Sequence, residues 1–221
     1  MELHGDERRG DCRIMVFARA PVPGATKTRL IPALGAEGAA KLHRRLVRRM
    51  LGEAVASGLG PVDLYCTPDT SHPFFAQCAG EFGVGLVVQS GADLGARMGH
   101  AFSQSLKRAR HALVVGSDIP SLMARHLQQA RAALDGKDAV YAPAEDGGYV
   151  LLGLKQPQPA LFHDIAWGGG AVMAHSRERA AAAAVSLAEL ETLWDLDRPE
   201  DLARVAPGLL AGLIRQDLPS P

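Results

Sequence analysis

Short apolar runs rich in β-branched residues recur along this chain, separated by segments whose apolar residues recur at helical spacing. Continuous apolar runs of this length are typical of strands that are buried on both faces of a sheet. Alternation of such strands with helices is typical of parallel sheets joined by crossover helices. The sequence therefore predicts an α/β fold. The expected strands cover residues 14–18, 62–66, 86–88, 113–115 and 140–142.

Three helical segments are expected to cover this sheet. The first runs through residues 42–54, the second is opened by Arg97, and the third begins at Ser121 as its N-cap. Opposite its apolar stripe, the first carries the basic residues Lys41, Arg44, Arg45, Arg48 and Arg49. A nucleic-acid patch would combine such charges with aromatic residues on a basic protein, whereas no aromatics are interleaved here and the formal net charge is zero. We therefore interpret this face as solvated and expect no nucleic-acid partner.

The pattern changes at residues 149–154, which form another apolar, strand-like run. Only the short link containing Asp146-Gly147-Gly148 separates this run from the preceding strand. A link of this length permits a hairpin but not a crossover helix. We therefore expect one antiparallel strand in a mixed, mostly parallel sheet.

Composition limits the class of protein further. The chain has 221 residues, of which 47% are apolar and 22% charged, and no apolar run approaches the roughly 20 residues that a membrane-spanning helix needs. We expect residues 1–12 to be a loose tail, since they lack the apolar core of a signal peptide, and residues 13–221 to form a single domain. Three cysteines without a Cys-x-x-Cys pair indicate a reducing compartment. The expectation is a cytoplasmic protein without a membrane span.

The loop after the first strand is the most informative segment. It reads Phe-Ala-Arg-Ala-Pro-Val-Pro-Gly-Ala-Thr-Lys-Thr-Arg-Leu over residues 17–30 and leaves the carboxyl end of a strand, where open α/β sheets place their ligands. Lys27 and Arg29 offer a point charge and a planar fork for phosphate oxygens. The alternative is that both are surface charges on a proline-rich turn. The functional interpretation assigns nucleotide contacts also to Ala18, Arg19, Gly24 and Thr28.

This loop is not an ordinary P-loop. A P-loop that ends at Lys27 would need glycine at positions 21 and 26, which hold Pro21 and Thr26. The predicted anion site therefore depends on lysine and arginine side chains at the strand end.

A second strand-end segment, residues 114–120, presents Ser117 and Asp118 directly after Gly116. A carboxylate here could hold Mg²⁺ or Mn²⁺ against a diphosphate, because hard cations take oxygen ligands and share them with substrate phosphates. Asp118 could instead only form the turn before Pro120. We expect it to be the main metal ligand, with Ser117 contacting the substrate.

Two further loops complete the expected ring of strand ends. In residues 89–98, Gly95 would allow close approach of a ligand, and Arg97 is either a phosphate or base contact or a surface charge. In residues 143–149, carboxylates, glycines and an aromatic ring suit a hydroxyl-bearing ligand, although a plain hairpin turn would explain the glycines. The expected contacts in this second loop are Glu145, Asp146, Gly147, Gly148 and Tyr149.

Residues 195–202 contain two alternate carboxylates, expected on one strand face before a helix start. Asp197 with Glu200 resembles a capping box, and Asp197 is also a second candidate metal ligand. No His-Glu-x-x-His or Gly-x-Ser-x-Gly motif is present, so zinc-hydrolase and serine-hydrolase chemistry lack support.

By the order and spacing of five segments, the chain resembles a bacterial glycosyltransferase-like family of unknown function, often called radical-SAM/selenodomain-associated transferase 1. These segments are residues 17–30, 89–98, 116–122, 143–154 and 195–202. That family is similar to the nucleotide-diphospho-sugar transferases and to the molybdenum-cofactor and phospholactate guanylyltransferases. The resemblance implies a three-layer α/β/α GT-A fold. It also implies that the first loop holds the nucleotide phosphates, that Asp118 ligates a divalent metal, and that residues 145–149 face the acceptor or sugar.

The leading hypothesis is metal-assisted transfer from a nucleoside diphosphate sugar. Lys27 and Arg29 would stabilise the departing diphosphate, and Asp146 or Glu145 would accept the proton of an acceptor hydroxyl. A second hypothesis is nucleotidyl transfer from a nucleoside triphosphate to a phosphorylated acceptor with release of pyrophosphate. A third is a nucleotide-binding protein without turnover. The acceptor, the nucleotide, the stereochemical outcome and the oligomeric state stay open at this level.

Overall fold

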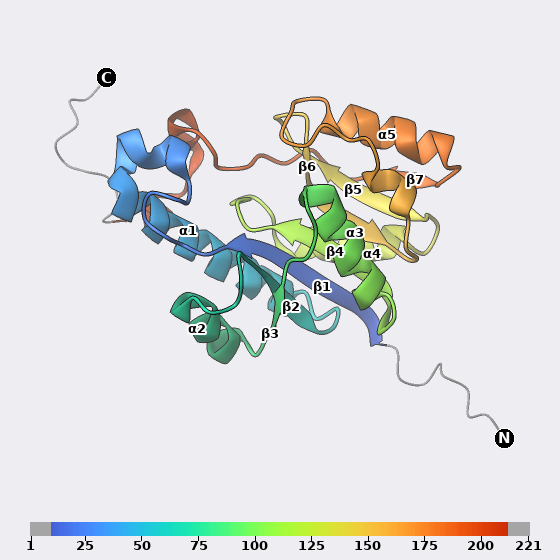
Figure 1. The fold of residues 1–221 in the computed structure, drawn as a ribbon, viewed down its shortest axis with the longest axis horizontal. Helices are drawn as coiled ribbons and strands as arrows, with labels where there is room; N and C mark the ends of the chain where they lie inside the picture. Colours follow the sequence, from blue (N-terminus) through green and yellow to red (C-terminus); the bar gives the residue numbers. More distant parts are fainter. Residues whose placement is uncertain (1–9, 212–221) are drawn as a thin grey trace.

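A single seven-stranded sheet forms the centre of the protein in a computed structural model that describes residues 10–211 (Figure 1). The strand order is β3-β2-β1-β4-β6-β5-β7. Only β6 runs antiparallel, between β4 and β5, and the other paired strands are parallel. The predicted mixed, mostly parallel sheet is therefore confirmed. The strands are β1 (Gly10–Arg19), β2 (Val62–Thr67), β3 (Gly85–Val88), β4 (Ala109–Gly116), β5 (Ala139–Pro143), β6 (Tyr149–Leu154) and β7 (Leu187–Glu189).

Helices cover both faces of this sheet because successive strand residues point to opposite sides. On β1, Ile14 and Val16 face one apolar cluster and Met15 and Phe17 face another. The first cluster is completed by α1 (Ile31–Ala56), α2 (Pro73–Phe82) and α4 (Ala124–Ala133). The second is completed by α3 (Leu94–Ser105) and α5 (Val172–Ala182), which gives the expected three layers.

A third apolar cluster joins the start of α1 to the C-terminal part of the described chain. It packs Leu30 and Leu42, from η1 (Thr28–Leu30) and α1, against Leu196 and Val205. Leu196 precedes η3 (Pro199–Arg204), and α6 (Pro207–Leu210) follows η3. The remaining short helix, η2 (Pro159–Phe162), follows β6 and is not part of this cluster. The segment after β7 thereby lies beside the first turns of α1 (Figure 1). This packing brings residues near position 196 to the first loop.

The structure corrects the expected ends of several elements. Strand β1 begins at Gly10, so it starts inside the tail expected for residues 1–12, of which residues 1–9 lie outside the described part. Helix α3 begins at Leu94 and is capped by Asp93, whose carboxylate accepts the Ala96 N–H at 2.8 Å, so Arg97 does not open it. The hairpin between β5 and β6 is confirmed.

The expected N-cap at Ser121 was wrong. Helix α4 begins at Ala124 with Met123 as N-cap, because the His126 ring accepts the Met123 N–H at 2.9 Å and Glu53 accepts the Ala124 N–H at 2.7 Å. The His126 ring folds back onto the start of its own helix, whereas Glu53 reaches it from α1, and no local sequence pattern indicates either contact. The single-domain partition stays a prediction. Within residues 10–211, no helix is long and apolar enough to cross a membrane.

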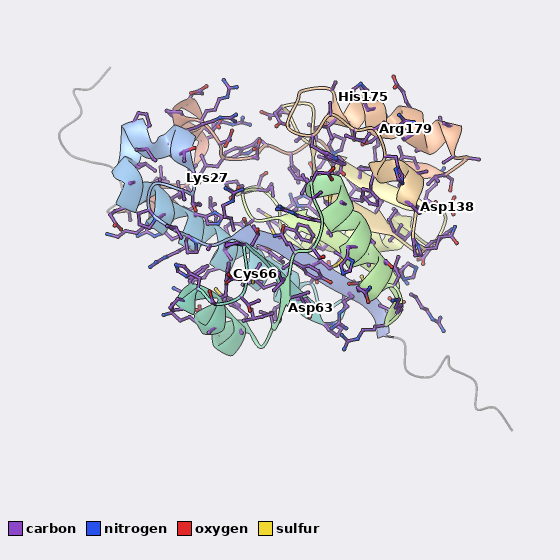
Figure 2. The ribbon with its side chains drawn as sticks, in the orientation of Figure 1. Lys27, Asp63, Cys66, Asp138, His175 and Arg179 are labelled. Carbon is purple, nitrogen blue, oxygen red and sulfur yellow. The ribbon has the colours of Figure 1, made fainter. Side chains whose placement is uncertain are left out.

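Asp138 ties together three segments at the β7 edge of the sheet (Figure 2). Its carboxylate accepts the Ser186 hydroxyl at 2.5 Å and the Ser186 N–H at 2.9 Å, and it lies 3.0 Å from Lys155 Nζ. The Ser186 hydroxyl, followed by Lys155, lowers the pKa of Asp138 to about 2. The charged carboxylate therefore stabilises the folded state.

We expect Asp138→Asn to lower the free energy of unfolding by about 1 to 2 kcal/mol at neutral pH, the usual cost of losing charged hydrogen bonds. Because the folded-state pKa is depressed, this contribution is present above the ordinary pKa of 3.8 and is lost as the pH falls toward about 2. Urea unfolding of both proteins at several pH values measures the difference. As a matched control, Asp164→Asn should change stability little, since Asp164 is exposed and its left-handed φ of 54° suits asparagine.

Candidate functional site

A cavity of about 560 Å³ lies at the carboxyl ends of β1 and β4, the position where open α/β sheets bind ligands. Strands β1 and β4 are neighbours, so Arg19 at the end of one and Gly116 at the end of the other open into the same space. Most of the side chains expected to contact the nucleotide lie here. They are Ala18, Arg19, Lys27, Thr28, Arg29, Arg97, Ser117, Asp118 and Asp197.

The loop after β1 folds so that Lys27 points into the protein. Buried Thr26 donates its hydroxyl to the Ala20 carbonyl at 2.8 Å, which closes the loop, and Gly24 has a φ of 80°. Lys27 itself adopts a left-handed conformation, with φ 51° and ψ 43°, immediately before η1. A lysine in this region is uncommon and costs of order 1 kcal/mol, and such strain clusters at functional sites.

Lys27, which Figure 2 shows near the start of α1, joins two segments that are remote in sequence. Its Nζ lies 2.9 Å from Asp118 Oδ2 and donates a hydrogen bond to the Leu196 carbonyl, and its side chain is only 5% exposed. The backbone repeats this link, because the Leu196 N–H donates to the Asp118 carbonyl at 2.8 Å. The segment that carries Asp197 is thereby fixed beside Asp118.

Asp118 is held as an anion at the edge of the cavity. Burial by itself raises the pKa of this carboxyl, but the positive charge of Lys27 and the contact with His43 outweigh burial and lower the pKa below its ordinary value. Its side chain is 37% exposed, so a ligand can still reach it. An ionised carboxylate at this place can bind a cation.

Sequence reasoning missed His43. It lies on α1 with its side chain 3% exposed, and its Nε2 donates to the Arg19 carbonyl at 2.9 Å, since a carbonyl can only accept. Its Nδ1 lies 3.3 Å from Asp118 Oδ1. The available signal was a histidine next to Leu42 in the apolar stripe of a helix, but the pattern alone does not say what such a residue faces.

A second cavity of about 410 Å³ adjoins the first, and Arg29 and Asp197 line both. These two side chains form an ion pair across the boundary. The other charged residues that line the second cavity are Glu145, Asp146, Asp195, Arg198, Asp201 and Arg204. The site therefore consists of two connected spaces with an arginine–aspartate pair between them.

The capping box expected from Asp197 and Glu200 was wrong. Asp201 accepts the N–H groups of Asp197 at 3.0 Å and Arg198 at 2.7 Å, and Arg198 is the N-cap of η3. Residues 195–198 also belong to no strand. The Asp197 carboxylate is therefore not used in capping and lines the cavities.

In the β5–β6 loop, Glu145 and Asp146 have different surroundings. The two oxygens of Glu145 accept hydrogen bonds from Arg204 at 2.7 and 2.8 Å, which lowers the pKa of Glu145. Asp146 accepts the Gly148 N–H at 2.9 Å and has no cationic partner within residues 10–211. Asp195, missed as a site residue, has a raised pKa because of burial and the neighbouring charge of Asp146. Asp146 and Asp195 are thus the freer carboxylates of the second cavity.

Several residues expected at the ligand line neither of these two cavities: Gly24, Gly95, Gly147, Gly148 and Tyr149. Tyr149 packs edge-on against Tyr141 and Trp167, with ring centroids 4.8 and 6.4 Å apart, and burial raises its pKa well above the ordinary value. Gly147 faces the Gly170 backbone so closely that a side chain would clash. Tyr149 and Gly147 therefore have packing roles beside the cavities.

Gly95 has a packing role, because a Cβ added there would lie 2.5 Å from the Trp167 ring. We expect Gly95→Ala to lower the free energy of unfolding by about 1 to 3 kcal/mol through overpacking. Thermal or urea unfolding measures the loss. Gly80→Ala is the matched control: Gly80 is also helical and nothing lies within 4 Å of its added Cβ, so alanine should leave stability unchanged or raise it.

Comparisons with known proteins place the chain in a family. The model of a family described as "Uncharacterized protein conserved in bacteria (DUF2064)" matches residues 50–169. A solved protein from Desulfovibrio desulfuricans G20, called a "putative nucleotide-diphospho-sugar transferase", is 30% identical, with a TM-score of 0.78 over 85% of this chain and 82% of that chain. The chain belongs to the DUF2064 family, and its fold is of the GT-A type. A search of curated proteins found no match.

Two more distant structures share the fold alone. The inositol-1-phosphate CTP transferase of T. maritima is 10% identical, with a TM-score of 0.60 over 96% of this chain and all of that chain. The protein Rv0371c of Mycobacterium tuberculosis H37Rv, solved in complex with manganese, is 14% identical, with a TM-score of 0.53 over 88% of this chain and 97% of that chain.

Proposed function

We propose that this member of the DUF2064 family transfers a glycosyl group from a nucleoside diphosphate sugar to a hydroxyl-bearing acceptor, assisted by Mg²⁺ or Mn²⁺. The observation that carries the proposal is the pair of connected cavities with opposite charge. Four basic side chains and two carboxylates line the first cavity, whereas three arginines and five carboxylates line the second. The first suits a diphosphate and the second suits a ligand without negative charge.

The second cavity argues against a phosphorylated acceptor. Glu145 is paired with Arg204, and Arg29 with Asp197, so these charges largely cancel. Asp146 has no cationic partner among the described residues, and its charge contributes to the raised pKa of Asp195. A phosphate would be repelled here, while a hydroxyl could donate to a carboxylate. Sugar transfer to a neutral hydroxyl therefore fits this cavity better than nucleotidyl transfer to a phosphate.

The carboxylates fit a divalent cation. Asp118 and Asp197 line the same cavity, and Mg²⁺ usually takes one or two protein carboxylates together with substrate phosphates and water. Among residues 10–211 no group of three or more ligating His, Cys, Asp or Glu side chains is present, so phosphate oxygens and water would complete the shell. A cation held there would neutralise charge on the departing diphosphate.

The side chains of the chain itself supply the remaining chemistry. Lys27 and Arg29 would bind the diphosphate oxygens and stabilise the charge that develops as the glycosidic bond breaks. Arg97, which lines the cavity from α3, would bind the nucleotide further along. Asp146 would accept the proton of the acceptor hydroxyl, since Glu145 is engaged by Arg204.

Nucleotidyl transfer is the second candidate. The four basic residues of the first cavity also suit a triphosphate, and the fold is shared with a CTP transferase. In this reaction a phosphorylated acceptor would attack the triphosphate and release pyrophosphate.

Product analysis separates these reactions. The protein is incubated with Mg²⁺ and with GTP, CTP or several nucleoside diphosphate sugars, each with a panel of hydroxyl-bearing and phosphorylated acceptors. Release of a nucleoside diphosphate with a glycosylated product supports the proposal. Acceptor-dependent release of pyrophosphate would sink it in favour of nucleotidyl transfer, and nucleotide binding without any turnover would indicate a binding protein.

A further inference from the structure

We infer that Lys27 and Arg29 occupy the two candidate metal carboxylates until a nucleotide arrives, so that the protein takes up a divalent cation together with the nucleotide and not before it. This inference rests on the proposed function, because it concerns the same cavity. It adds a property that the proposed reaction does not require, namely that the free protein excludes the metal.

Asp118 is already paired with a cation: its Oδ2 faces the Lys27 ammonium, and its Oδ1 accepts a hydrogen bond from the Ser117 hydroxyl at 3.4 Å. Oδ2 lies 2.9 Å from Lys27 Nζ, and Oδ1 lies 3.3 Å from His43 Nδ1. The side chains of Lys27 and His43 are only 5% and 3% exposed, so neither can simply swing into solvent. A hydrated cation that approaches Asp118 therefore meets a carboxylate whose charge is already balanced by the buried Lys27 ammonium.

The second carboxylate is neutralised in the same way. Arg29 donates to Asp197, and both side chains lie at the boundary between the two cavities. Lys27 and Arg29 together contribute two positive charges, the same as one divalent cation. The pair of carboxylates is thus electrostatically satisfied without metal.

Replacing Lys27 by a metal ion as the partner of Asp118 costs free energy when no nucleotide is bound. Lys27 would lose Asp118 as its counter-ion while its ammonium remained buried, and separating a buried ion pair without a replacement partner is strongly destabilising. Mg²⁺ in addition gives up its water ligands reluctantly. The Leu196 carbonyl is the other acceptor that the structure gives Lys27, and it carries no formal charge.

Nucleotide phosphates lower the free-energy cost of separating Lys27 from Asp118. Their oxygens can accept Lys27 and Arg29 and can at the same time share the divalent cation with Asp118 and Asp197. The two basic side chains would then move from carboxylate to phosphate. The left-handed backbone of Lys27, with its φ of 51°, adds a local strain that such a movement can release.

Titration of Mn²⁺ followed by electron paramagnetic resonance tests this inference without any measurement of turnover. The wild-type protein alone should bind Mn²⁺ weakly, and addition of CDP, GDP or UDP should tighten binding beyond what the nucleotide achieves without protein. Lys27→Met removes the charge but keeps a long apolar side chain. This variant should bind Mn²⁺ without nucleotide at least about tenfold more tightly than the wild type, a difference of about 1.4 kcal/mol.

Two further variants serve as controls. Arg29→Gln tests the same idea at a side chain that is 66% exposed, where folding is not at risk, and should also raise metal affinity, though less. Adding Asp118→Asn to Lys27→Met should remove the gain. Circular dichroism and thermal melting confirm that each variant is folded before titration.

The inference is overturned if folded Lys27→Met and Arg29→Gln bind Mn²⁺ no better than the wild type, or if wild type alone binds it as tightly as with nucleotide. Failure of the proposed function gives a different result. In that case product analysis shows acceptor-dependent pyrophosphate or no turnover, while the Mn²⁺ titrations of the wild type and the variants still report on Lys27 and Arg29. The two ideas can therefore fail separately.

Discussion

Replacement of Asp118 by asparagine is expected to lower kcat roughly 10³-fold, about 4 kcal/mol of transition-state stabilisation. Asparagine keeps the shape of the side chain and its ability to form the turn before Pro120, but it leaves the buried Lys27 without its counter-ion, so circular dichroism and thermal melting must first show that the variant is folded. It removes the charge that holds a divalent cation against the departing diphosphate. The measurement is kcat with the donor that product analysis identifies, at saturating metal.

The control for this variant is Asp135→Asn. Asp135 is exposed and pairs with Arg131 within the same helical region, away from both cavities, so its kcat should be unchanged. A folded Asp118→Asn protein that retains kcat within about tenfold of the wild type would show that Asp118 serves the turn and not the chemistry.

Loss of Lys27 should weaken binding of the nucleoside diphosphate by about 1 to 3 kcal/mol, as expected for a charged hydrogen bond to phosphate. Lys27→Met should lie at the upper end of this range, because the side chain is 5% exposed and little water screens its charge. Arg29→Gln should lie at the lower end, because Arg29 is 66% exposed. Calorimetric titration without metal isolates this contribution from metal binding.

The matched control is Lys41→Met, which removes a lysine from the exposed side of α1, outside both cavities. Its binding isotherm should superimpose on that of the wild type. Unchanged isotherms for both Lys27→Met and Arg29→Gln would refute the assignment of the first loop to phosphate binding. If only Arg29→Gln weakened binding, this would indicate that the diphosphate binds nearer to the second cavity.

Local patterns were sufficient for most of the fold. The apolar runs identified five parallel-type strands, and the short link at Asp146 identified the antiparallel one, because strand periodicity and turn length depend on neighbouring residues. The same patterns missed α2 and β7, of which β7 has only three residues. They also misplaced the start of α4, where the cap comes from His126 and from Glu53 on another helix.

What the sequence determined by itself is which residues stand at the carboxyl ends of β1 and β4, since parallel strands bring these ends to one edge of the sheet. Lys27, Arg29, Ser117 and Asp118 followed from this rule. Only the tertiary structure decided what faces them. The Leu196 carbonyl lies 169 positions from Lys27, and His43 reaches Asp118 from a helix face. Such contacts arise from packing between distant segments, which have no common periodicity in the sequence. They pair the basic residues of the first loop with the carboxylates of two other segments.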